Sequence, residues 1–179
     1  IVPGYYFRSD YLGRYTNGSG CGNELASERP MVRKFIIDSC LHWIKDYKID
    51  GIRFDLMELL DIDTTKEIVK KTTKLDKNFL IYGEPWKGGS SPLVNGTYKG
   101  SQKNENFSIF NDTFRDAIRG NNHPSSGFIN GNQYSSICNW SIIEGLKGSI
   151  YTITSNPNES INYVDAHDNY TLWDQVEKS

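Results

Sequence analysis

The stretch Ile49-Asp-Gly-Ile-Arg-Phe-Asp-Leu56 decides the fold. A short run of β-favouring residues follows Gly51 directly and closes on an acidic residue, Asp55. This pattern predicts an inner strand of an α/β protein with Asp55 at its carboxyl end. An amphipathic helix is predicted just before it, because Pro30 suits a first helical turn and apolar residues then recur every three or four positions as far as Tyr47.

The same alternation repeats along the rest of the chain. Further strands are predicted over residues 79–82, 107–110 and 161–166, and further helices over 64–75, 112–118 and 141–146. Strand, helix and strand in units of about thirty residues favour parallel strands with helices outside them. A doubly wound sheet and a (β/α) barrel both have this rhythm, and periodicity does not choose between them. The segments 86–106 and 120–138 are predicted to be long loops.

Composition and charge exclude several classes of partner. The chain has 179 residues, of which 37% are hydrophobic, and this predicts one globular unit rather than a disordered segment. The formal net charge is −2 and neither sign is gathered into a block, so we expect neither nucleic acid nor a membrane as a partner. Nothing in the sequence decides the localisation.

The cysteines and tryptophans have simple structural interpretations. Cys21, Cys40 and Cys138 are an odd number without a Cys-x-x-Cys pair, so we expect buried free thiols rather than disulfides or a zinc site. Trp43 falls at helical spacing and is expected in the core.

Three carboxylates follow predicted strands. Asp55, Glu84 and Asp168 each stand at or just beyond the carboxyl end of a strand, and parallel strands bring such positions to one rim. Acids placed close together raise one another's pKa, an arrangement useful where one acid must stay protonated near neutral pH. A retaining glycosidase needs such a pair, one ionised to attack the anomeric carbon and one protonated to donate to the leaving oxygen.

Three motifs carry a family resemblance. Gly51-Ile-Arg-Phe-Asp-Leu56 is similar to the fourth-strand motif of the α-amylase superfamily, Tyr82-Gly-Glu-Pro-Trp86 to its fifth-strand motif, and Tyr163-Val-Asp-Ala-His-Asp-Asn169 to its seventh. The resemblance implies that Asp55 is the nucleophile, Glu84 the general acid/base and Asp168 the acid that favours the distorted transition state.

The same resemblance implies a set of substrate contacts. Arg53 is expected to point the same way as Asp55 and to keep its carboxylate ionised through charge-assisted hydrogen bonds. Trp86 is expected to offer an aromatic platform to a sugar ring. His167 and Asn169 are expected to contact sugar hydroxyls.

A finer resemblance, to the type I pullulanases, extends over nearly the whole chain. The stretches that carry it, besides the strand motifs, are Asn17-Gly-Ser-Gly-Cys-Gly-Asn23, Glu28-Arg-Pro-Met-Val-Arg-Lys34, Gly83-Glu-Pro-Trp-Lys-Gly-Gly-Ser-Ser-Pro92, Phe110-Asn-Asp-Thr-Phe-Arg-Asp116 and His167-Asp-Asn-Tyr-Thr-Leu-Trp173. This resemblance implies a hydrolase that cleaves α-1,6-glucosidic bonds in pullulan and in branched α-glucans.

The fold implied by the resemblance is a partial (β/α)8 barrel. Residues 1–179 would form an internal fragment of one catalytic domain, with strands four to seven, their helices and long loops. We expect the isolated fragment to be inactive, since half a barrel leaves apolar edges uncovered.

The sequence is also compatible with two rival functions and with one metal. Another enzyme of the superfamily, such as an isoamylase, a neopullulanase or a glucanotransferase, would share the three acids, and a glycan-binding barrel without catalysis would be a rival of another class. No cofactor is expected to be required. Calcium is common in the superfamily, but the sequence has no compact ligand loop among the candidate acids Asp10, Asp61, Asp63, Asp112 and Asp116.

Overall fold

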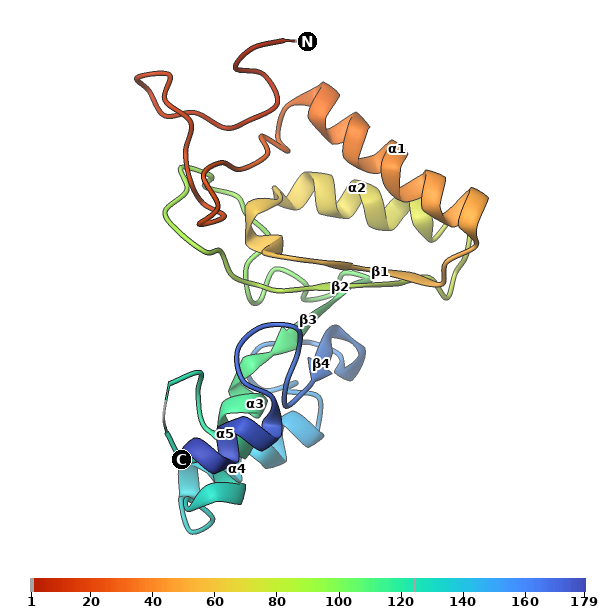
Figure 1. The fold of residues 1–179 in the computed structure, drawn as a ribbon. Helices are drawn as coiled ribbons and strands as arrows, with labels where there is room; N and C mark the ends of the chain where they lie inside the picture. Colours follow the sequence, from red (N-terminus) through yellow and green to blue (C-terminus); the bar gives the residue numbers. More distant parts are fainter. Residues whose placement is uncertain (1, 124) are drawn as a thin grey trace. The chain divides into compact units, whose positions relative to one another are not determined.

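The predicted alternation of strands and helices is present in the computed structural model of the chain, which describes residues 2–123 and 125–179 (Figure 1). The chain divides into two compact units, one ending at Phe107 and the other beginning at Ser108. Each unit contains a pair of parallel strands. The expectation of a single domain stays a prediction. Of the predicted loop 120–138, residue 124 lies outside the described residues.

The first unit joins two helices to one pair of strands. Its elements are α1 (Pro30–Tyr47), β1 (Gly51–Phe54), the short 3-10 helix η1 (Met57–Leu59), α2 (Ile62–Thr72) and β2 (Leu80–Gly83). Both α1 and α2 lie on the same side of the strand pair (Figure 1). Strand β1 pairs with β2 in parallel, as the strand–helix–strand rhythm predicts.

The ends of these helices follow from local chemistry. Helix α1 has Pro30 in its first turn and ends at Tyr47, where the C-cap residue Lys48 adopts a left-handed φ of 56°. Helix α2 is capped by Asp61, whose carboxylate accepts a hydrogen bond from the backbone N–H of Thr64. The helix therefore begins two residues before the predicted start at residue 64, because its cap lies at Asp61.

The apolar stripe of α1 is wider than the face that the first unit covers. Val32, Ile36, Ile37, Cys40 and Ile44 are buried. Trp43, however, is 46% exposed, so its expected place in the core is wrong for this chain. Periodicity predicts which side of a helix is apolar, and it leaves open how much of that side a neighbouring element covers. Within the first unit that neighbour is α2.

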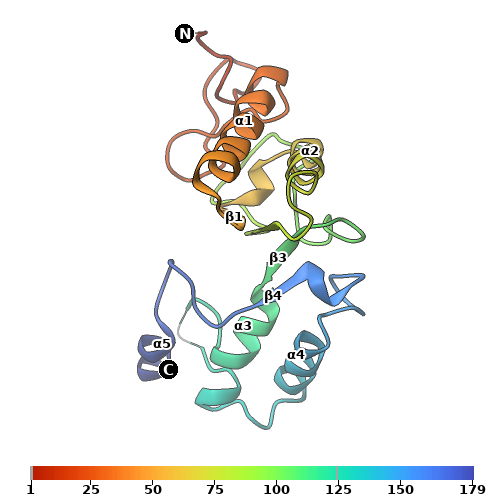
Figure 2. The ribbon, with the colours of Figure 1, turned by 90° about the vertical axis from the view of Figure 1, so that its right-hand side faces the viewer.

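The second unit joins a shorter pair of strands to several helices. Its elements are β3 (Ser108–Asn111), α3 (Asp112–Arg119), η2 (Phe128–Asn130), α4 (Ser136–Leu146), η3 (Pro157–Glu159), β4 (Ser160–Asn162) and α5 (Leu172–Lys178). Strands β3 and β4 are parallel, and α3 packs against both α4 and α5 (Figure 2). A Cβ on Gly145 would lie 2.3 Å from the Phe114 ring, which shows how closely α3 and α4 approach.

Two boundaries in the second unit differ from the prediction by more than one residue. Helix α4 begins five residues before the predicted residue 141, because the Ser135 side chain caps the helix by accepting from the backbone N–H of Cys138. Strand β4 ends at Asn162 instead of continuing to residue 166. Beyond Asn162, hydrogen bonds from the side chains of Arg115 and Arg119 hold the chain in place of strand pairing.

The remaining predictions concern cysteines and membrane spans. All three cysteines are free, and burial raises the pKa of the Cys40 thiol to about 11. Cys21 is exposed and Cys138 half-buried, so the expectation of buried thiols is correct only for Cys40. Among the described residues, no helix combines the length and the apolar character needed to cross a bilayer.

Candidate active site

The two acids of the first unit stand on neighbouring strands at the same edge. Asp55 is the first residue after β1 and Glu84 the first residue after β2. Because Phe54 is the register partner of Gly83, the acids that follow them are adjacent across the strand pair. Their nearest carboxylate oxygens lie within 4.8 Å of each other.

One guanidinium joins the two acids. Arg53 Nη1 lies 2.5 Å from Asp55 Oδ1, and Nη2 lies 2.5 Å from Glu84 Oε1. The arginine lies two residues before Asp55 on β1, so its side chain leaves the same face of the strand. Its single positive charge therefore lies between two carboxylates and offsets part of their repulsion.

The two acids have unequal surroundings. The Asp55 side chain is 58% exposed, whereas that of Glu84 is 3% exposed. Glu84 Oε2 accepts a hydrogen bond from the backbone N–H of Leu56 at 2.9 Å. Leu56 has a left-handed φ of 44°, an uncommon conformation for a branched apolar residue. The turn after β1 thus aims one backbone donor at the buried acid.

Burial is the main influence on Glu84. Burial raises the pKa of its carboxyl above the ordinary value, and the nearby charge of Asp55 adds to the increase. The hydrogen bond from Leu56 and the charge of Arg53 act in the opposite direction but do not cancel the effect. Of the two acids, the buried one is therefore suited to hold a proton.

Replacement of Gly83 by alanine is expected to destabilise the site. A Cβ at this position would lie 2.6 Å from Met57 Sδ and 2.7 Å from the carbonyl oxygen of Phe54. Met57 is fully buried, so the overlap must be relieved by movement of β1 or β2. We expect Gly83→Ala to cost about 1–3 kcal/mol of stability, measured as a lower thermal unfolding midpoint of the full-length protein. An unchanged midpoint would contradict this account of the packing.

The remaining predicted residues of the site lie in the second unit. His167, Asp168 and Asn169 follow β4 in an exposed segment, with His167 Nε2 3.5 Å from Asp168 Oδ1. Asn169 has a left-handed φ of 65°, which asparagine adopts more readily than most residues. The structure places these three side chains in one segment of the second unit. Their approach to Asp55 and Glu84 stays a prediction.

Two arginines of α3 hold the start of that segment, and sequence reasoning missed this role. Arg115 Nη1 donates to the hydroxyl of Tyr163 at 2.7 Å. Arg119, only 2% exposed, donates from Nε to the carbonyl oxygen of Val164. The arginines are four residues apart, a spacing that places both on one face of a helix. That spacing was the available signal.

Trp86 and several of the candidate calcium ligands have defined surroundings. Trp86 is half-buried in the segment after β2. Among the described residues, three of the acids considered for calcium pair with arginines: Asp10 with Arg14, Asp61 with Arg33, and Asp116 with Arg115. These acids therefore have local structural partners.

Comparison with known proteins places the whole chain in one group. No family model matches. The chain is 40% identical to the pullulanase of Bacillus subtilis (strain 168) over 98% of its own length. In structure it is similar to a pullulanase from Bacillus acidopullulyticus, with a TM-score of 0.94 and 46% identity over 98% of the chain. It is also similar to the pullulanase of Anoxybacillus sp. LM18-11 complexed with maltotriose, with a TM-score of 0.90 and 42% identity over 97% of the chain.

These matches cover only part of each relative. The chain spans 25% of the Bacillus subtilis protein, 22% of the Bacillus acidopullulyticus chain and 25% of the Anoxybacillus chain. The close structural agreement over this part confirms the predicted α/β fold as a portion of the catalytic domain. In sequence and in fold, the chain is similar to pullulanases over about a quarter of their length.

Proposed function

We propose that this chain is part of a retaining glycoside hydrolase that cleaves α-1,6-glucosidic bonds in pullulan and branched α-glucans. The observation that carries the proposal is the pair of acids with unequal environments. Asp55 is exposed and held by Arg53, and Glu84 is buried with a raised pKa. Their oxygens lie within 4.8 Å, a separation that suits a retaining enzyme better than an inverting one, which needs space for a water between the acids.

The unequal environments suggest one role for each acid. Asp55 would attack the anomeric carbon and form a glycosyl ester, while Glu84 donates its proton to the departing glycosidic oxygen. Glu84, now a carboxylate, would then take a proton from a water molecule that attacks the same carbon and releases Asp55. Two inversions at one carbon give net retention of the anomeric configuration.

The remaining site residues have supporting roles in this proposal. Asp168 would hold sugar hydroxyls and favour the distorted ring of the transition state, and His167 and Asn169 would donate hydrogen bonds to the same sugar. Trp86 would offer an indole face to the apolar C–H face of a glucose ring. An oligosaccharide substrate is supported by solved pullulanases complexed with maltotriose and maltotetraose, each 42% identical to this chain.

Digestion of pullulan by the full-length protein tests the proposal. Hydrolysis of its α-1,6 bonds is expected to release maltotriose as the main product, and chromatography of the reaction mixture checks this outcome. Products other than maltotriose would indicate cleavage of α-1,4 bonds and an enzyme of another type within the superfamily. Binding of pullulan without any increase in reducing ends would indicate a glycan-binding protein.

A further inference from the structure

The segment 86–92 follows Glu84 and contains Trp86, but it has no regular secondary structure. Backbone hydrogen bonds of a helix or sheet therefore do not determine its position. Its position therefore depends on contacts with other parts of the first unit. One such contact is the ion pair of Lys87 with Glu58 of η1, and others come from the loop formed by residues 8–28. We call residues 8–28 the N-terminal loop.

The backbones of the two segments are in direct contact. The N–H of Gly89 donates to the carbonyl oxygen of Gly18 at 2.8 Å. A Cβ on Gly88 would lie 2.3 Å from the carbonyl oxygen of Ser19, and one on Gly89 would lie 2.5 Å from that of Asn17. Side chains at either glycine would force the segments apart, so this approach requires glycine.

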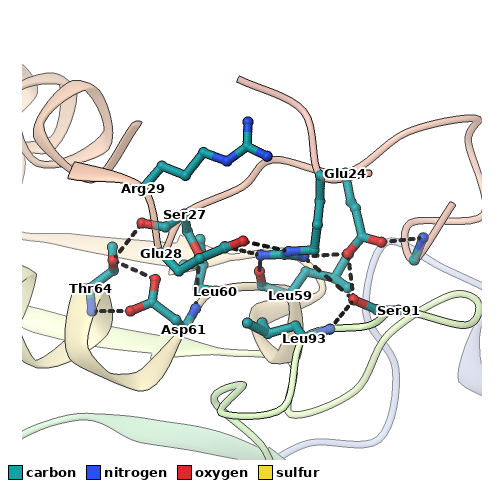
Figure 3. A network of polar contacts seen from close by, with 12 residues as sticks. Glu24, Ser27, Glu28, Arg29, Leu59, Leu60, Asp61, Thr64, Ser91 and Leu93 are labelled. Carbon is teal, nitrogen blue, oxygen red and sulfur yellow. Dashed lines mark hydrogen bonds and ion pairs between the residues drawn. The ribbon is translucent and has the colours of Figure 1, made fainter. Parts of the chain in front are cut away.

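A buried ion pair also supports this contact through its side chains. Arg8 and Glu24, both in the N-terminal loop, form a salt bridge with side chains that are 4% and 0% exposed. Glu24 also accepts a hydrogen bond from Ser91 Oγ at 2.6 Å (Figure 3). The hydroxyl of Ser91 in turn accepts from the N–H of Leu93 at 3.1 Å. The carboxylate of Glu24 thus connects the N-terminal loop to the segment 86–92.

The same carboxylate also orders the N-terminal loop itself. Glu24 Oε1 accepts from the N–H of Gly18 at 3.2 Å, and Gly18 is the residue whose carbonyl binds Gly89. Arg8 donates to Glu28 and, at 3.3 Å, to the carbonyl oxygen of Leu59 in η1, the turn that follows Asp55. One connected network therefore reaches the segments that follow both acids.

Both members of the ion pair remain charged. Burial alone would raise the pKa of Glu24, but hydrogen bonds from Ser91 and Thr16 and the charge of Arg8 outweigh it and lower the pKa. Burial would likewise lower the pKa of Arg8, yet Glu28 and Glu24 raise it. A buried charge pair with several satisfied hydrogen bonds resists movement, because either charge would be left unpaired.

We infer that the N-terminal loop is a positioning element of the sugar-binding site, with Glu24 as its central residue. Through Ser91 and the glycine contact, Glu24 sets the place of the segment 86–92, and with it the indole of Trp86. Loss of this contact should weaken the binding of glucose units of the substrate and leave the chemical step at Asp55 and Glu84 largely intact. This inference rests on the proposed glycosidase function.

Steady-state kinetics of Glu24→Gln and Ser91→Ala in the full-length protein test the inference. Ser91→Ala removes the hydrogen bond to Glu24, whereas Glu24→Gln removes the charge that pairs with Arg8 and replaces one acceptor oxygen by an amide donor. Ser91→Ala is the milder change if Glu24→Gln does not fold. We expect KM for pullulan to rise about tenfold, since small misplacement of binding groups has effects of this order or larger. The kcat value should stay within about twofold of wild type.

Asp61→Ala is a matched control for lost stability. Asp61 is also buried, and its carboxylate pairs with Arg33 of α1. It also accepts a hydrogen bond from Thr64 of α2 (Figure 3). Neither of these side chains lies in the N-terminal loop. This variant should lower the thermal midpoint without changing KM. An unchanged KM in Glu24→Gln and Ser91→Ala would overturn the inference. Failure of the wild-type protein to cleave pullulan would instead refute the proposed function.

Discussion

Asp55→Asn in the full-length protein is expected to abolish pullulan hydrolysis, with kcat lowered on the order of 10⁴-fold or more. The amide that replaces the carboxylate cannot attack the anomeric carbon, and loss of a nucleophile has effects of this size in other enzymes. Reducing-sugar assays measure the loss. Because Asp55 lies at the surface of the first unit, the variant should fold and still bind maltotriose, which calorimetry can check.

Asp50→Asn is a matched control for this change. Asp50 precedes β1 and is exposed, so the same substitution is made at the opposite end of the same strand. Its kcat should equal that of wild type. Activity of Asp55→Asn near the wild-type value would remove the assignment of the nucleophile, whereas loss of both activity and binding would point to misfolding.

Glu84→Gln is expected to lower kcat on pullulan by about 10²–10⁴-fold, the usual contribution of a general acid/base. A maltotriosyl fluoride should still react with Asp55, because fluoride leaves without a proton. The glycosyl ester would then accumulate, since no carboxylate activates water. Added azide should restore turnover and yield a glycosyl azide of retained configuration, identified by NMR; absence of azide rescue would contradict the role of Glu84 as the acid/base.

Glu84→Gln should also change the stability of the folded protein, and the size of this change should depend on pH. Since burial raises the pKa of Glu84, the folded protein keeps this proton to a higher pH than the unfolded chain. The stabilisation is complete below the unfolded pKa of about 4.3 and is lost as pH rises through the folded pKa. Glutamine does not titrate, so the thermal midpoint of Glu84→Gln relative to wild type should rise between acid and neutral pH.

Glu67→Gln provides the control for this comparison. Glu67 lies on α2 in a partly exposed i,i+4 pair with Lys71, so the same change there removes a carboxylate without altering the site. Its midpoint relative to wild type should change little with pH, because exposed ion pairs contribute little. If the thermal midpoint of Glu84→Gln relative to wild type is also independent of pH, this result would contradict a raised pKa of Glu84.

Local sequence signals predicted the elements of the fold, and failed where contacts between distant residues decide. Pro30 and the run from Gly51 to Phe54 placed α1 and β1 correctly because helix starts and strand patterns depend on neighbours in sequence. Strand β4 was predicted too long, because the strand-like sequence pattern continues to residue 166 although the pairing with β3 stops at Asn162. Beyond Asn162 the chain is held by Arg115 and Arg119 of α3. The spacing of these arginines indicates a shared helix face, but not which segment that face contacts.

By itself, the sequence determined the resemblance to pullulanases and the placing of Asp55 and Glu84 side by side, since residues that follow paired parallel strands reach one edge whatever surrounds them. Only the tertiary structure decided the difference between the two acids of the first unit. The exposure of Asp55, the burial of Glu84 and the shared bond to Arg53 arise from side-chain packing. Solvation and hydrogen bonding set a pKa, and both depend on residues far apart in sequence that folding brings together.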